Sequence, residues 1–217
     1  MSYRPLVLAL MFAAGAAGLA VAQTASPPPF QGPVLAQDRV LSRAIGSLEV
    51  SSSAFAPGGA IPLVNSGYGK SVSFPISWTP GPSGTHAYAV IVEDPESHMP
   101  QPTLHWLVYN IPGAATSLGK SIHSRADISG GKPMLQGLNS KGGIGYVGPH
   151  PAIGDPPHHY HVQVFALSRM LPLGGGATLD QVVNAMTDRV LAEGELIGTF
   201  EAPAPDAKPD GKAKPKP

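Results

Sequence analysis

The chain contains 26 glycines and 25 prolines, which together are almost a quarter of its 217 residues. Glycine destabilises helix interiors, and proline removes a backbone donor and breaks helices. Both residues suit turns and the edges of sheets. A helical bundle or a coiled coil is therefore excluded. We expect a single domain of short strands joined by many turns.

The composition also excludes several functional classes. The chain has no cysteine, so disulfides, zinc–thiolate sites, iron–sulfur clusters and cysteine nucleophiles are ruled out. Fourteen basic and fourteen acidic residues balance each other, and the body of the chain has no basic stripe. We therefore expect no nucleic-acid partner, because such proteins rely on neutralising phosphate charge.

Residues 1–22 have the features of a secretory signal. Arg4 provides a short positive region, residues 5–21 are apolar, and Ala20-Val21-Ala22 fits the small-x-small cleavage rule. We expect cleavage before Gln23 and a periplasmic or secreted protein without a transmembrane span in the mature chain. The alternative is an uncleaved membrane anchor of similar length.

The two ends of the mature chain differ in composition from its body. Residues 23–37 contain SPPPF and are expected to be a flexible arm. Residues 206–217 alternate lysine with proline and alanine, a composition that cannot bury a core and predicts disorder. The alternative for this tail is contact with anionic surfaces. The folded domain is expected over residues 38–205.

The body has the pattern of a β-sandwich with a peripheral helix. A capping-box sequence, Thr178-x-x-Gln181, predicts a helix over 179–191. In residues 161–167, side chains alternate, so Val162 and Val164 face away from Phe165. Strands are expected over 48–52, 74–78, 87–93, 105–111, 161–167 and 195–201, separated by clusters of turn residues.

Histidines are concentrated in two loops of this pattern. Seven of the eight histidines lie between residues 98 and 161, and six of them sit in or beside two loops rich in proline and glycine. Each loop adjoins a hydrophobic strand. Rigid strand ends that hold polar side chains at a loop-rich end of a fold are a common form of binding site.

Strand alternation predicts which side chains of the second histidine cluster share a face of the sheet. His158 and Tyr160 point to one face. If they meet Asp94 and His105, they form a pocket with two imidazoles, a phenol and a carboxylate. Imidazole N–H and phenol O–H groups can bind an anionic oxygen, and the carboxylate can fix a histidine tautomer or pair with a cationic ligand group. This pocket suits a small anion or an amine-bearing phosphate; the alternative is a set of structural histidines at strand ends.

Both loops resemble the signature regions of the phosphatidylethanolamine-binding proteins, the Raf kinase inhibitor-like family, in its bacterial branch. The first signature is matched by Asp94-Pro95, His105 and the run HWLVYNIP. The resemblance covers roughly residues 48–203, including the segments NSGYGKSVSFPISW, QGLNS and AMTDRVLAEGELIGTFE. The second signature is matched by Gly145-Tyr146, Gly148-Pro149, Pro151, Gly154, His158, Tyr160 and His161.

The resemblance implies a fold and a site. The fold is a mostly β, Greek-key antiparallel β-sandwich with a large central sheet, a smaller sheet and short peripheral helices, one near the C-terminus. The family's pocket takes phosphate, acetate or phosphorylethanolamine head groups. Its ligand-binding positions correspond to Asp94, His105, His158 and Tyr160, and its pocket wall corresponds to Pro95 and Gly148.

The chain departs from the family pattern at four positions around this pocket. The usual D-P-D-A-P loop reads D-P-E-S-H, so Glu96 is a longer acid and His98 replaces a proline with a fixed φ. Ala152 replaces a pocket-wall proline, and His159 replaces a usual arginine. These changes put the loop backbone and the ligand preference in question.

Three functions remain as hypotheses. The first is an exported, non-catalytic binding protein for a small anion or a phospholipid head group. The second is an inhibitor or regulator of another protein, for which export leaves a protease as the partner; a homodimer stays open. The third is a metal site or hydrolase, based on His159-x-His161. We expect neither an enzyme nor a metal or cofactor, because no G-x-S-x-G or H-E-x-x-H motif occurs.

Overall fold

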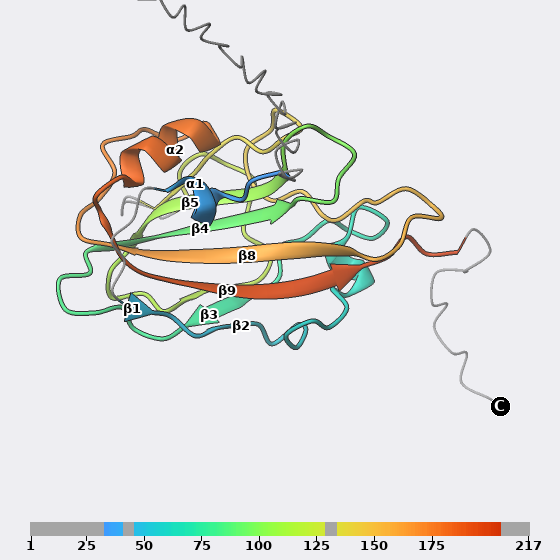
Figure 1. Ribbon diagram of the computed structural model, residues 1–217, viewed down its shortest axis with the longest axis horizontal. Helices are drawn as coiled ribbons and strands as arrows, with labels where there is room; N and C mark the ends of the chain where they lie inside the picture. The colour runs from blue at the N-terminus through green and yellow to red at the C-terminus, as the bar shows by residue number, and fades with distance from the viewer. Residues whose placement is uncertain (1–32, 41–45, 129–133, 205–217) are drawn as a thin grey trace, which may run out of the picture. The chain divides into compact units, whose positions relative to one another are not determined.

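The computed structural model describes residues 33–40, 46–128 and 134–204 (Figure 1). The expected signal segment, residues 1–22, and the expected tail, residues 206–217, lie outside these ranges. In chain order the elements are α1 (Ala36–Arg39), β1 (Gly46–Ser47), β2 (Val50–Ser51), the 3-10 turn η1 (Leu63–Asn65), β3 (Ile76–Trp78), β4 (Ala87–Asp94), β5 (Thr103–Pro112), β6 (Ser117–Leu118), β7 (Leu135–Gln136), β8 (His158–Leu167), α2 (Leu179–Met186) and β9 (Val190–Phe200).

Two sheets form a sandwich. The larger sheet has the strand order β1-β9-β8-β4-β5-β7, and the smaller sheet has the order β2-β3-β6. All pairs are antiparallel except β1 with β9, which is parallel and so departs from the expected antiparallel pattern. The helices α1 and α2 lie on one side of the large sheet, and β2 and β3 lie on the other (Figure 1). The expected β-sandwich with short helices, one near the C-terminus, is confirmed.

The large sheet is buried on both faces, and β4 shows how its sequence achieves this. Val90 and Val92 point into the core between the two sheets, whereas Ala89 and Ile91 point into a second core under the helices. Each of these side chains is at most 1% exposed. A strand buried on both faces is expected to be continuously hydrophobic, which explains the run AYAVIV.

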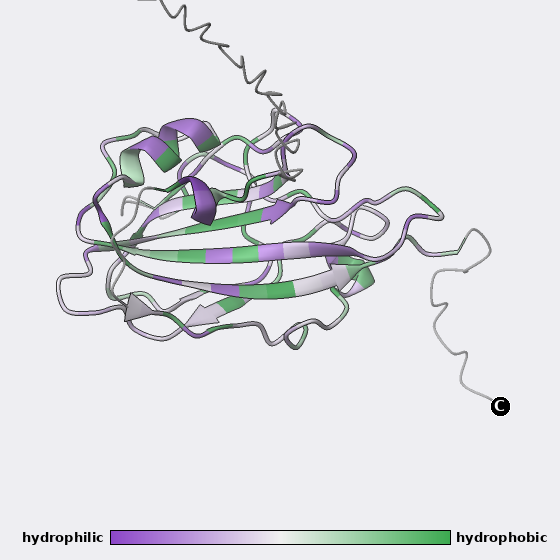
Figure 2. Cartoon of the chain, in the orientation of Figure 1, coloured by the Kyte–Doolittle hydropathy of each residue, from purple (hydrophilic) through white to green (hydrophobic). Residues whose placement is uncertain are grey.

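Strand β8 follows the alternation expected from its sequence. Val162 and Val164 belong to the core between the sheets, and Phe165 belongs to the core under the helices. The hydropathy changes toward one end of the sheet, where the C-terminal end of β4 and the N-terminal end of β8 are hydrophilic (Figure 2). This is the end at which the polar loops leave the sheet.

The predicted helix over 179–191 begins as expected but ends five residues early, at Met186. Thr178 and Gln181 form the expected capping box. The chain leaves the helical conformation at Thr187, with ψ of 130°, and Asp188 then adopts a left-handed backbone conformation, with φ of 58°. Val190 then pairs with Leu167 of β8, so the last strand starts earlier than the predicted residue 195.

Helix α1 begins within the stretch expected to be a flexible arm. Its Ala36 is fully buried, and the Ala36 N–H donates a hydrogen bond of 2.8 Å to Glu93 Oε2 in β4. Ala36 and Gln37, the last two residues of the expected arm, thus form hydrogen bonds with the large sheet. Among the described residues, no helix is both long enough and apolar enough to cross a membrane.

Candidate ligand-binding site

The site lies where three strands of the large sheet end together. Strand β4 is antiparallel to both neighbours, so its last residue, Asp94, pairs with Thr103 at the start of β5. On the other side, Glu93 pairs with His161 near the start of β8. The loops over 95–102 and 149–157 therefore leave the sheet at the same end and surround one cavity.

A β-bulge brings His105 to this cavity. Val92 pairs with Trp106 and Glu93 pairs with Leu104, so His105 is the extra residue on β5. A bulge interrupts strict alternation and redirects a side chain. The redirected ring meets Tyr160 edge to face, with 5.2 Å between ring centroids. The bulge thus places an imidazole beside a phenol.

The cavity has a volume of about 280 Å³. Asp94, His105, His158 and Gly148, which the sequence singled out, all line it. Tyr160 is 1% exposed and lies behind His105, and Pro95 lies outside the lining. The remaining lining residues are Ser97, His98, Thr103, Lys141, Val147, His150, Pro151, Ala152 and Asp155.

Asp94 organises both His158 and the first loop. His158 Nδ1–H donates to Asp94 Oδ2 at 2.9 Å, and both side chains are almost completely buried. Asp94 Oδ1 accepts hydrogen bonds from the backbone N–H groups of Glu96 and Ser97, at 2.8 Å and 3.1 Å. The carboxylate therefore fixes the histidine tautomer, as the sequence suggested, and also holds the turn that follows β4.

One ring nitrogen of His105 is hydrogen-bonded to the protein, and the other has no partner among the described residues. Its Nδ1 lies 2.7 Å from the carbonyl oxygen of Val147, so Nδ1 must carry the proton. Burial lowers the pKa of His105, although the Val147 hydrogen bond and the charge of Asp94 oppose this. Nε2 is buried and has no hydrogen-bond partner among the described residues. His105 thus offers an acceptor, where sequence reasoning expected an N–H donor.

Tyr160 supplies the complementary group. Its hydroxyl is buried and makes no hydrogen bond within the described part of the chain. Burial raises the pKa of Tyr160, and the nearby charge of Asp94 raises it further. The phenol is therefore protonated at neutral pH, and its O–H can donate to a ligand, for which the nearby Asp94 carboxylate is the competing acceptor. Buried polar atoms without partners are uncommon and often mark a place where a ligand binds.

The opposite wall of the cavity is held rigidly. Gly148 N–H donates to Ser71 Oγ at 2.7 Å, and a Cβ atom on Gly148 would lie 2.4 Å from the carbonyl oxygen of Asn65. This close approach explains the glycine. The ring of His150 stacks on Tyr68, with centroids 4.2 Å apart.

The residues of this site lie in a segment that matches a protein-family model. The family model described as phosphatidylethanolamine-binding protein matches residues 51–201. The chain belongs to the phosphatidylethanolamine-binding protein family.

Curated family relatives match most of this chain. A UPF0098 protein of Aquifex aeolicus is 34% identical over 171 residues, covering 78% of this chain and 98% of the relative. A putative lipoprotein, LppC of Mycobacterium tuberculosis, is 31% identical over 195 residues, covering 89% and 92%.

Two solved structures resemble this one. The putative phosphatidylethanolamine-binding protein homologue CT736 of Chlamydia trachomatis has a TM-score of 0.64 and 32% identity, and the match covers 73% of this chain and 99% of CT736. For YbcL of E. coli, described as a member of the mammalian family, the TM-score is 0.66 and the identity 28%, with coverage of 73% and 100%.

The departures from the family sequence pattern compensate for one another. Glu96, the longer acid, reaches the ring of His159, with 3.0 Å between carboxylate and Nδ1. His98 Nε2 lies 3.2 Å from Asp155 Oδ2, which links the two loops across the cavity mouth. In place of a proline, position 98 thus contributes a solvent-exposed contact between the two loops.

His159 and His161 are hydrogen-bonded to two different carboxylates. Each pairs with its own carboxylate: His159 with Glu96, and His161 Nδ1 with Glu195 Oε1 at 2.8 Å. In the described ranges there is no group of three or more His, Cys, Asp or Glu side chains placed to hold a metal ion.

Sequence reasoning did not place Asp155, His98 or Lys141 in the cavity. All three lie on loops, where no strand period fixes the direction of a side chain. A signal was available for Asp155, because it precedes the histidine cluster within a turn-forming G-D-P-P sequence.

Proposed function

We propose that this protein is an exported binding protein whose cavity takes a small phosphate monoester, free or as a phospholipid head group, without chemical turnover. The observation that supports this best is a pair of buried, unpartnered polar atoms, Nε2 of His105, which lines the cavity, and Oη of Tyr160, whose ring packs edge to face on His105. One is an acceptor and the other is a donor. A ligand that satisfies both must present a hydrogen-bond donor and a hydrogen-bond acceptor close together.

A protonated phosphate group has both features. Its P–OH can donate to His105 Nε2, and one of its P–O⁻ oxygens can accept from Tyr160. Sulfate has the same shape, but at neutral pH it carries acceptors only, so His105 would stay unsatisfied. A site with buried hydrogen-bonding groups rejects a ligand that leaves one of them unpaired.

The size of the cavity and its rim favour a ligand with an amine. A volume of about 280 Å³ lies at the lower limit of small-molecule sites and suits a head group. The Asp155 side chain is 21% exposed, compared with 5% for Asp94, so an ammonium group would reach Asp155, whose Oδ2 also contacts His98 Nε2 and the Ala152 N–H. Phosphorylethanolamine fits these requirements.

The hydrogen bonding of Ser97 supports binding without catalysis. Ser97 lines the cavity, but its hydroxyl bonds to the backbone carbonyl oxygen of Asp94 at 3.2 Å. A catalytic serine would need its hydroxyl to face a base such as His158.

Titration calorimetry with phosphate and sulfate tests the proposed chemistry. Near pH 6 we expect phosphate to bind at least tenfold more tightly than sulfate, because only phosphate can donate to His105. Phosphate monoesters lose their last proton with a pKa of about 6, so the advantage over sulfate, measured with ethyl phosphate, should shrink as the pH rises from 6 toward 8. Phosphorylethanolamine should bind more tightly than ethyl phosphate. Equal affinities for phosphate and sulfate would contradict the proposed role of His105.

Export is supported by the composition of residues 1–22 and by the similarity to a protein named as a putative lipoprotein. We expect the mature chain to begin at Gln23 and to be recovered outside the cytoplasm. N-terminal sequencing after cell fractionation measures this. An intact Met1 on a cytoplasmic protein would show that the export part of the proposal is wrong.

A further inference from the structure

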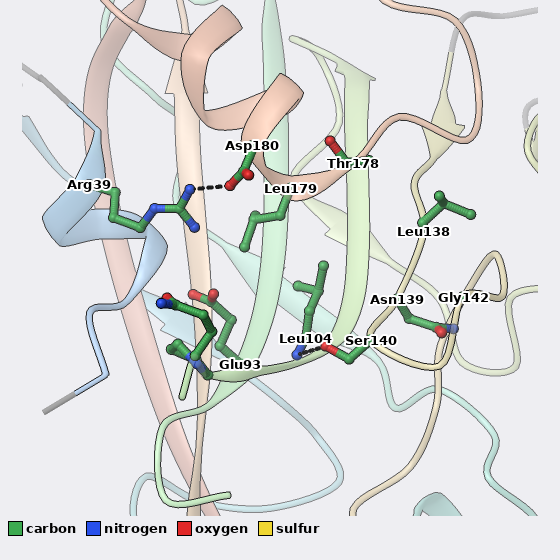
Figure 3. Close-up of a pocket in the computed structure, with 12 residues that line it drawn as sticks. Arg39, Glu93, Leu104, Leu138, Asn139, Ser140, Gly142, Thr178, Leu179 and Asp180 are labelled. Atoms are coloured by element: carbon green, nitrogen blue, oxygen red, sulfur yellow. Dashed lines mark hydrogen bonds and ion pairs between the residues drawn. The ribbon is translucent and has the colours of Figure 1, made fainter. Parts of the chain in front are cut away.

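A second and larger cavity lies on the helix-covered face of the large sheet (Figure 3). Its volume is about 680 Å³. Side chains from α1, β4, β5, the loop after β7 and the start of α2 surround it. The residues used below are Arg39, Glu93, Leu104, Leu138, Leu179 and Asp180.

The large sheet separates this cavity from the candidate phosphate site. In β4, Glu93 lines the second cavity, and its neighbour Asp94 lines the first. In β5, Leu104 lines the second cavity, and its neighbour His105 lines the first. Adjacent residues of the same strands therefore point to opposite faces of the sheet. The second cavity is a distinct space.

Glu93 is the unusual residue in the second cavity. It is fully buried, which is rare for a glutamate unless its carboxyl group is paired. Glu93 Oε2 accepts two hydrogen bonds of 2.8 Å, from the Ala36 N–H and from Gln163 Nε2. Glu93 Oε1 has no hydrogen-bond partner among the described residues. The carboxyl group faces the space between Arg39, Leu104 and Leu179 (Figure 3).

Several other polar groups of the wall are already bonded to the protein. Ser140 Oγ accepts from the Leu104 N–H at 2.8 Å, and the Asn139 side chain bonds to backbone groups of its own loop. Arg39 forms an ion pair with Asp180. Much of the remaining wall is apolar, formed by Leu104, Leu138 and Leu179.

The protein compensates the charge of the Glu93 carboxylate only in part. Burial raises the pKa of Glu93, while hydrogen bonds from Gln163 and Ala36 and the charges of Arg39 and His161 oppose this rise. The charge of Arg39 is itself balanced by Asp180. An ammonium group at Oε1 would give the buried carboxylate both a charge partner and a hydrogen-bond donor.

We propose that this cavity is a second ligand site, which binds a small primary amine with an apolar body. The ammonium group donates to Glu93 Oε1, and the apolar body packs against Leu104, Leu138 and Leu179. This inference is independent of the phosphate-binding proposal, because it uses the other face of the sheet and different side chains.

Binding of n-hexylamine to the mature chain at pH 8 tests the inference, with n-hexanol and hexanoate as matched probes. Calorimetry should show hexylamine binding at least tenfold more tightly than hexanol, and hexanoate binding most weakly. In Glu93→Gln we expect hexylamine affinity to fall ten- to a hundredfold. The variant should fold, because the amide oxygen can accept both hydrogen bonds now made by Oε2. Phosphate affinity should not change.

Two further variants control for the Glu-to-Gln change itself and test where hexylamine binds. Glu201→Gln makes the same isosteric change at an exposed position and should leave hexylamine binding unchanged. Leu179→Trp keeps Glu93 but fills the cavity, and it should abolish hexylamine binding. The inference is overturned if hexylamine does not bind the wild type, if all three probes bind equally, or if Glu93→Gln or Leu179→Trp retains wild-type affinity.

Discussion

Replacing Asp94 with alanine is expected to lower the midpoint of thermal unfolding by about 5–15 °C. The Asp94 carboxylate accepts hydrogen bonds from His158 Nδ1 and from the backbone N–H groups of Glu96 and Ser97. Alanine leaves all three donors without their partner, and each unsatisfied buried donor costs about 1–3 kcal/mol. Because the backbone donors can be partly rehydrated, we expect a loss of roughly 2–4 kcal/mol in the free energy of unfolding.

Thermal unfolding of two further variants, followed by calorimetry or circular dichroism, shows whether the lost hydrogen bonds of Asp94 cause the loss of stability. Asp94→Asn keeps an oxygen acceptor for the loop and should lose less than half as much stability as Asp94→Ala. Asp155→Ala removes a more exposed carboxylate at the rim of the same cavity and should shift the midpoint by only a few degrees. Equal midpoints for wild type and Asp94→Ala would show that the carboxylate does not hold the loop.

Periodicity predicted the parts of the fold in which a strand runs without interruption. The alternation of β8 places His158 and Tyr160 on the face that carries Val162 and Val164, as the structure shows. The apolar run of β4 likewise predicted a strand, which the structure shows to be buried on both faces. In such segments, side-chain direction follows directly from the two-residue period of a strand.

The position of His105 could not be derived from periodicity. Strict alternation along β5 would place His105 on the same face as Leu107, under the helices. The bulge opposite Val92 and Glu93 turns His105 toward Tyr160 instead. A bulge depends on how two strands pair, and one strand alone carries no signal for it. Resemblance to the family placed His105 at the site where periodicity could not.

Two further features depend on contacts between distant parts of the chain. The end of α2 was missed because Val190 fits the apolar face of a longer helix, whereas pairing with Leu167 places it in β9. The burial of Glu93 requires both Ala36 and Gln163, which are far from it in sequence. Likewise, the hydrogen-bonding state of His105 and Tyr160 depends on their three-dimensional neighbours.

The second large effect concerns Tyr160. In Tyr160→Phe we expect phosphate affinity to fall about ten- to a hundredfold, because a hydrogen bond to a charged group contributes about 1.5–3 kcal/mol. Stability of the ligand-free protein should be unchanged or slightly higher. The lost hydroxyl is buried without a partner, so its removal breaks no hydrogen bond of the protein.

Tyr146→Phe is the matched control, because the same atom is removed with the opposite consequence. The Tyr146 hydroxyl donates to the carbonyl oxygen of Asn65 at 2.8 Å, whereas the Tyr160 hydroxyl has no hydrogen-bond partner among the described residues. This variant should lose about 0.5–1.5 kcal/mol of stability and keep its phosphate affinity.

Calorimetric titration of phosphate into wild type, Tyr160→Phe and Tyr146→Phe, paired with melting of each ligand-free protein, tests the central claim most directly. We predict that Tyr160→Phe loses affinity without losing stability, and that Tyr146→Phe loses stability without losing affinity. If Tyr160→Phe binds phosphate as tightly as the wild type, the unpartnered hydroxyl is not a ligand-binding group and the proposed phosphate site is wrong.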